Sequence, residues 1–75
     1  MTLQEVELNT KVTIKELRSK GSIRRRLLDL GILPNTEIEP IHTSPSGNMR
    51  AYFIKGTSIA LRDDESSDII VEKRG

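Results

Sequence analysis

The chain has 75 residues, with twelve Lys and Arg side chains, eleven Asp and Glu side chains and no Cys, so its formal net charge is +1. Charges this balanced exclude an overall electrostatic attraction to nucleic acid or anionic lipid, and the missing Cys excludes disulfides and thiolate metal sites. We expect one domain over residues 1–75. No secretory signal is expected, because the chain does not start with a basic region followed by an apolar run, and no membrane insertion is expected, because no segment approaches the roughly 18 consecutive apolar residues of a span.

The first expected element is a strand over residues 11–17. Val12 and Ile14 alternate with polar side chains at a period of two, which is typical of a strand with one face on a core. A polar connector over residues 18–22 separates this strand from the next element.

A helix of about two turns is predicted near residues 23–30. Ile23, Leu27 and Leu30 recur at i, i+4 and i+7, so we expect them to share one apolar face that packs on the core. Ser22 is placed to cap the first turn through its hydroxyl. Gly31 suits the left-handed residue that closes a helix.

The chain after this helix predicts further strands. Pro34 and Asn35 favour a turn, and a strand over 36–41 follows with Ile38 facing inward. Pro40 cannot donate to a neighbouring strand, so it marks an edge or a bulge. The remaining expected elements are a hairpin within 49–62, one helical turn within 63–68 and a closing strand over 68–73.

These elements predict a mainly β fold, a small barrel of about five strands with a short helix inserted between the first two strands. A parallel strand-helix-strand unit is the competing interpretation. The helix is too short for such a crossover, and hairpins join the later strands, so the barrel is favoured.

Three consecutive arginines, Arg24, Arg25 and Arg26, lie in the predicted helix. Consecutive helical residues are about 100° apart, so the three side chains cannot form one flat contact, and Arg25 should point most directly outward. A solvated helix face, a docking patch for an acidic partner and a nucleic-acid contact are all open interpretations. Tyr52 and Phe53 are the only aromatic residues, which disfavours base stacking and hence nucleic acid.

The sequence offers little for catalysis or metal binding. His42 is the single histidine, and the acidic segment of residues 63–68 lacks the spacing of a calcium loop. No thiol nucleophile or phosphate-binding loop is present. We therefore expect no enzyme, no catalytic residue, no metal site and no cofactor. Weak ferrous iron binding through oxygen ligands, Asp63, Asp64 and Glu65, or through His42, stays open as an alternative.

Residues 24–41, RRRLLDLGILPNTEIEPI, resemble the signature of the FeoA family, small cytoplasmic proteins of bacterial ferrous iron uptake. The family pattern is a helix ending in Arg-Leu-x-x-Leu-Gly, then an apolar residue and a turn with Pro, matched here by Arg26, Leu27, Leu30, Gly31, Ile32 and Pro34. A later Pro-x-Gly loop and Gly-x-x-Ile-Ala-Leu-Arg strand are matched by Pro45, Gly47, Gly56, Ile59, Ala60, Leu61 and Arg62. The likeness covers about residues 6–73. It departs at Asn35, where the family usually has Gly, and at Ser66 and Ser67, where it usually has Ala.

The resemblance implies an SH3-like barrel and a non-enzymatic role as a cytoplasmic accessory of FeoB, a membrane iron transporter with a cytoplasmic GTP-binding domain. Association with the membrane through that partner and self-association both stay open. The candidate partner-binding residues are Arg24, Arg25, Arg26, Leu33, Met49 and Tyr52. A more specific version of this accessory role is that one of the arginines stimulates GTP hydrolysis by the transporter. The alternative is a nucleic-acid-binding or regulatory module akin to the C-terminal domain of iron-dependent repressors, because a fold can be shared without its function.

Overall fold

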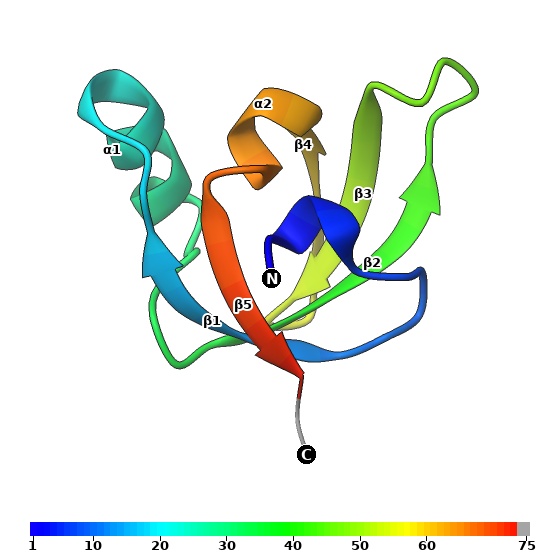
Figure 1. Ribbon diagram of the computed structural model, residues 1–75, viewed down its shortest axis with the longest axis horizontal. Helices are drawn as coiled ribbons and strands as arrows, with labels where there is room; N and C mark the ends of the chain where they lie inside the picture. Colours follow the sequence, from blue (N-terminus) through cyan, green and yellow to red (C-terminus); the bar gives the residue numbers. More distant parts are fainter. Residues whose placement is uncertain (74–75) are drawn as a thin grey trace.

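The strands form one antiparallel sheet in the order β4-β3-β2-β1-β5 in the computed structural model, which describes residues 1–73 (Figure 1). This confirms the predicted mainly β fold with a helix between the first two strands. Residues 74 and 75 of the predicted domain lie outside the described residues. The elements are η1 (Leu3–Glu5), β1 (Val12–Leu17), α1 (Gly21–Asp29), β2 (Glu37–Thr43), β3 (Met49–Ile54), β4 (Thr57–Arg62), α2 (Asp63–Ser66) and β5 (Ile69–Lys73).

The long strand β2 passes from one half of the sheet to the other. Near its start it pairs with β1 through Val12 opposite Ile38, and further along it pairs with β3. The register with β3 shifts between Pro40 and His42, which leaves Ile41 as the extra residue of a bulge. The prediction of an edge or a bulge at Pro40 is therefore resolved as a bulge, because β2 lies in the middle of the sheet.

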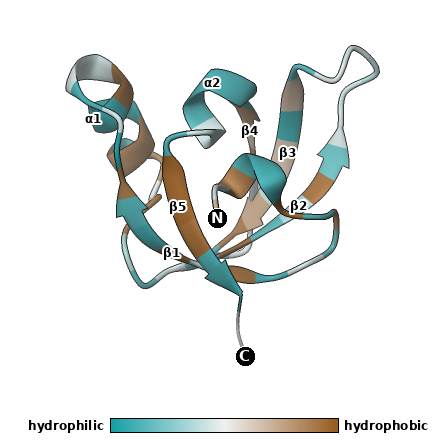
Figure 2. Ribbon diagram, in the orientation of Figure 1, coloured by the Kyte–Doolittle hydropathy of each residue, from teal (hydrophilic) through white to brown (hydrophobic). Residues whose placement is uncertain are grey.

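The core lies inside the curved sheet and is closed by η1, α1 and α2. Figure 2 shows apolar residues on β5, on part of η1 and on part of α1. Tyr52 is the largest of the fully buried side chains. The buried apolar residues are Leu3, Val6, Val12, Ile14, Leu17, Leu27, Ile32, Ile38, Tyr52, Ile54, Leu61, Ile69 and Val71. No helix within residues 1–73 is long and apolar enough to cross a bilayer.

The N-terminal segment covers the free edge of β5, which the sequence patterns did not predict. Thr2 forms a bridge with Ile70, and the Val71 N–H donates to the Met1 carbonyl at 2.8 Å. Arg50 on β3 fastens the same segment, since its guanidinium donates to the carbonyls of Gln4 at 2.9 Å and of Val6 at 2.7 Å.

The end of α1 has the predicted geometry, and its start does not. Gly31 has φ +88°, and the N–H of Ile32 donates to the Leu27 carbonyl at 3.0 Å, which is the hydrogen bond expected at a glycine-closed helix end. The helix begins at Gly21 after Lys20, and no side chain caps it. The predicted cap by Ser22 is therefore wrong, because the helix starts before that residue.

The predicted apolar face of α1 is only partly correct. Leu27 is fully buried, and Leu28 and Leu30 pack partly against the core, but Ile23 is 43% exposed. Figure 1 shows α1 standing beside the sheet at one corner of the molecule. Its first turn therefore extends past the core, which explains why the regular spacing of Ile23 does not place it inside.

Candidate functional site

Two of the three helix arginines hold α1 in place. Arg24 donates from Nη1 to the Leu17 carbonyl at 3.0 Å, which joins the helix to the end of β1. Arg26 pairs with Glu65 of α2, a carboxylate that is 5% exposed. The second oxygen of Glu65 accepts the Arg62 N–H at 2.9 Å, so this carboxylate links α1, α2 and the end of β4. The sequence did not predict this role for Arg24, Arg26 or Glu65.

Arg25 has no such role, because it is exposed and makes no hydrogen bond or ion pair within residues 1–73. Two apolar side chains of the same region are also exposed, Ile23 by 43% and Leu33, in the turn after the helix, by 39%. Ile23 and Arg25 lie about 160° apart around a helix axis, so one flat surface cannot cover both. We call these three residues, Ile23, Arg25 and Leu33, the free residues of α1 and its turn.

The other two predicted contact residues do not belong with the helix. Met49 is half-buried and lines a shallow hollow with Asn48, Arg62, Asp63 and Asp64. In Figure 1, α2 lies between α1 and the start of β3. Met49 is therefore not grouped with the arginines by the fold.

Tyr52 is wrong as a surface contact, because its exposed fraction is 0%. Successive residues of a strand face opposite sides, so only one member of the Tyr52-Phe53 pair can point inward. Tyr52 is the inward one, and Phe53 is 44% exposed. The alternation was visible in the sequence, but the choice between the two aromatic rings was not.

Arg50 lies over the Tyr52 ring, with its guanidinium carbon 5.7 Å from the ring centre. The Tyr52 hydroxyl makes no hydrogen bond within residues 1–73, although Ser66 and Arg50 lie close enough to lower its pKa. Burial is the larger effect and raises the pKa of Tyr52 above its ordinary value.

We expect the buried Tyr52 to make the fold sensitive to alkali. Because its pKa is raised on folding, its contribution to the free energy of unfolding is complete below about pH 10 and is lost as the pH rises from there through the folded pKa. Tyr52→Phe lacks the ionising hydroxyl and should lose less stability between about pH 9 and about pH 11. Urea unfolding of both proteins across this range measures the difference. Equal losses of stability in the two proteins would contradict the assignment of this alkaline sensitivity to Tyr52.

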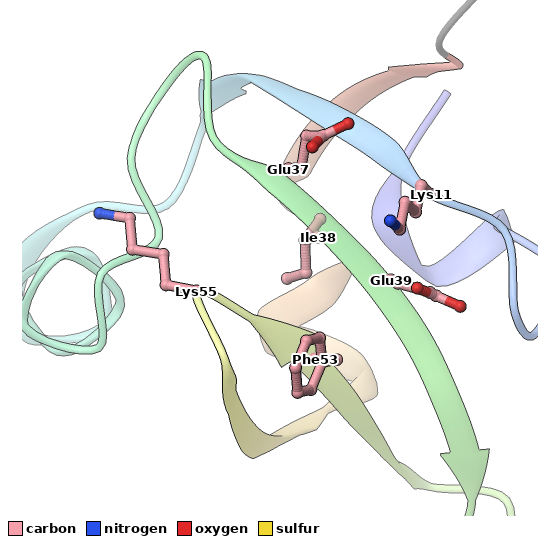
Figure 3. A pocket seen from close by; sticks show the side chains of 6 residues that line it. All are labelled: Lys11, Glu37, Ile38, Glu39, Phe53 and Lys55. Atoms are coloured by element: carbon pink, nitrogen blue, oxygen red, sulfur yellow. The ribbon is translucent and has the colours of Figure 1, made fainter.

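A shallow hollow lies on the outer face of the sheet, and the sequence analysis missed it. It has a volume of about 120 Å³ and is lined by Lys11, Glu37, Ile38, Glu39, Phe53 and Lys55. Figure 3 shows the Phe53 ring and the Glu39 carboxylate on neighbouring strands, and the Lys55 amine pointing away from the ring. Its opposing charges and open shape give no indication of a particular ligand.

The residues suggested for weak iron binding do not form a metal centre within residues 1–73. No group of three His, Asp or Glu side chains converges there. Glu65 is engaged by Arg26 and by the Arg62 N–H. His42 lies exposed on β2.

Comparisons with known proteins show the family of this chain. The model of the FeoA domain matches residues 1–73. A Campylobacter jejuni protein provisionally assigned as Fe(2+) transport protein A is 30% identical over 71 residues, which cover 95% of this chain and 96% of that protein.

Solved structures show the same likeness. The solution structure of iron(II) transport protein A from Clostridium thermocellum superposes with a TM-score of 0.93 at 30% identity, over 97% of this chain and 45% of that one. This chain thus spans less than half of that chain. The zinc complex of FeoA from Stenotrophomonas maltophilia has a TM-score of 0.85 at 28% identity, over 96% of this chain and 89% of that one. That protein is described as an SH3 domain protein, so the expected SH3-like fold is confirmed.

Proposed function

The chain belongs to the FeoA family, and from this premise we propose that it is a cytoplasmic, non-enzymatic accessory of ferrous iron uptake that docks on the cytoplasmic region of a FeoB-type transporter. The relatives support the link to ferrous iron transport. The Stenotrophomonas protein has been proposed to act as a bacterial ferrous iron transport activating factor. Docking on the transporter goes beyond what the relatives support, and the support for it comes from the surface of α1.

The observation that carries the proposal is the unequal use of the three arginines. Arg24 and Arg26 hold the helix rigidly, at Leu17 and at Glu65. Arg25 has no partner within the described residues and is free to meet a carboxylate of another protein. A pre-ordered helix binds without a further entropy cost for folding, so it is a suitable docking element.

The free residues of α1 and its turn also indicate the shape of the partner site. Ile23 and Leu33 add exposed apolar surface to the charge of Arg25. Because Ile23 and Arg25 lie on different sides of the helix, the partner must form a groove around the first turn rather than a flat face. Such a groove would combine an acidic residue with an apolar wall.

The decisive variant is Arg25→Glu. We expect it to weaken binding to the soluble cytoplasmic part of the FeoB-type transporter by about tenfold or more, since the charge would face a carboxylate. Arg24 is left unchanged because its guanidinium supports the fold. Lys11→Glu makes the same charge change outside α1 and should bind normally. Calorimetry with GDP and then with a GTP analogue measures both affinities, and the nucleotide dependence shows whether docking follows the GTPase cycle.

Two outcomes would count against this proposal. If the unchanged protein binds neither nucleotide state, docking on this region fails. If Arg25→Glu binds as tightly as the unchanged protein, docking elsewhere on the surface is required. GTP turnover in the same samples tests whether an arginine of this protein stimulates hydrolysis. In that case the unchanged protein should accelerate GTP hydrolysis, and Arg25→Glu should not.

The nucleic-acid alternative has less support. It needs several free cations along one face, because its affinity comes from phosphate neutralisation. In α1, Arg24 donates to a main-chain carbonyl and Arg26 pairs with Glu65. Only Arg25 is then free among the three helix arginines, which is too little charge for a nucleic-acid contact.

A further inference from the structure

The two ends of the sheet differ in how their edges are covered. At one end, β5 is covered by the N-terminal segment through Thr2 and Met1. At the other end, β4 pairs with β3 on one side only, and within residues 1–73 no segment pairs with its outer edge. An open edge is a template for pairing with another strand, and proteins usually protect it with Pro, Lys or a bulge. Residues 57–61 of β4 contain none of these.

The hairpin turn shows where the backbone groups of β4 point. Lys55 and Gly56 form a two-residue turn with φ 49° and 80°, the geometry of a type I′ turn. The flanking residues, Ile54 and Thr57, therefore exchange hydrogen bonds across the hairpin. The direction of the backbone N–H and C=O groups alternates along the strand from there, so those of Ile59 also bond to β3.

The backbone groups of the residues that alternate with Thr57 and Ile59 point away from β3. Ser58, Ala60 and Arg62 direct their N–H and C=O groups to the outer edge. The Arg62 N–H confirms the alternation, because it donates to Glu65 Oε1 at 2.9 Å rather than to β3. Glu65 thus covers the end of the edge at Arg62, and the backbone groups of Ser58 and Ala60 remain open.

We propose that β4 pairs antiparallel with β4 of a second copy of this chain, with Ser58 opposite Ala60 of that copy. In this register Ser58 and Ala60 each donate and accept across the interface, so every open group is satisfied. A two-fold axis passes beside Ile59, which then lies opposite Ile59 of the second copy and loses the rest of its exposure. Centring the axis on Ser58 or on Ala60 instead would use fewer of the open groups or would require the covered Arg62 N–H.

Charge complementarity identifies the occupant as a second copy. Lys55 lies in the turn before β4 and Asp63 is the first residue of α2 after it, so this antiparallel register brings the Lys55 end of each β4 beside the Asp63 end of the other. These opposite charges flank β4 at its two ends, and the two-fold axis forms the pair twice. The small side chains of Ser58 and Ala60 are exposed and give no steric hindrance on the outer face.

Sedimentation equilibrium of the full chain tests this pairing. The weight-average mass should rise from that of one chain toward that of two as the concentration increases to about 1 mM. Ala60→Pro removes an outward N–H and should keep the mass at one chain throughout. A single-chain mass for the unchanged protein at about 1 mM would overturn the proposal, and so would an Ala60→Pro variant that associates equally well.

A charge exchange tests the register without touching the backbone. Lys55→Glu places two acids opposite each other and should raise the dissociation constant about tenfold, whereas Lys11→Glu should leave it unchanged. Adding Asp63→Lys to Lys55→Glu reverses both members of each pair and should restore association. The register is wrong if Lys55→Glu associates normally or if the double variant is no better than the single one. Circular dichroism confirms that each variant is folded.

Discussion

Leu27→Ala should lower the free energy of unfolding by about 2–5 kcal/mol, whereas Ile23→Ala should change it by no more than about 0.5 kcal/mol. The two residues occupy equivalent positions in the helical repeat. Leu27 is fully buried, and Ile23 is 43% exposed. Truncating Leu27 leaves a cavity where α1 meets the core, but truncating Ile23 removes atoms that are mostly in water.

Urea unfolding of the two alanine variants measures this contrast. A domain of this size has a total stability of only about 4–11 kcal/mol, so the loss in Leu27→Ala should be visible as a large shift of the midpoint. Ile23→Ala is the matched control, because it removes a similar aliphatic side chain from the same helix. Similar losses in the two variants would mean that the first turn of α1 packs on the core, and Ile23 could not then be a free residue of that helix.

Arg26→Met should destabilise the fold by about 1–2 kcal/mol, the second largest effect that we expect. The substitution keeps an apolar stem but removes the guanidinium, and Glu65 is left 5% exposed with the Arg62 N–H as its remaining donor. Breaking a fully buried pair costs more. The Arg26 side chain is 53% exposed, so solvent screening reduces the expected loss.

A double-mutant cycle with Glu65→Gln separates the pair from the individual side chains. Arg26→Met and Glu65→Gln should each destabilise the protein, and the double variant should lose less than the sum of the two. Arg25→Met is the control, since Arg25 has no partner within residues 1–73 and should lose about 0.5 kcal/mol or less. Additive losses for Arg26 and Glu65 would show that the contact between α1 and α2 does not contribute to stability.

The same variants connect stability with the proposed function. Arg24 and Arg26 position α1, and Arg25 is proposed to contact the partner. Arg26→Met should therefore change the unfolding transition more than Arg25→Met does. In binding experiments, Arg25→Glu should show the larger loss while its unfolding transition stays close to that of the unchanged protein.

The local features of this fold were predictable from the sequence. Gly31 ends α1 with φ +88°, Asn35 adopts φ 70° in the turn that follows, and Pro40 begins a bulge. Each of these depends on steric limits and hydrogen bonds within a few residues of the chain. The succession of strands along the chain from residue 11 onward and the hairpin around Gly56 follow from the same kind of local information, together with the period-two pattern.

The functional assignments depended on which side chains are buried and which contact each other, and only the tertiary structure decided that. Periodicity places Ile23 and Leu27 on one helix face but cannot show that the core ends before Ile23. Alternation places Tyr52 and Phe53 on opposite faces without choosing the inner one. Arg26 and Glu65 are 39 residues apart, and no local rule relates them.

The sequence by itself therefore determined the family, the elements from residue 11 onward and the turns between them, because these depend on residue types at short spacing, whereas η1 was not predicted. The tertiary structure decided which arginine is free and which strand edge is open. Both depend on how distant segments cover one another: Glu65 engages Arg26, and the N-terminal segment protects β5 while β4 stays open. Such long-range packing is set by the whole core rather than by any single stretch of the chain.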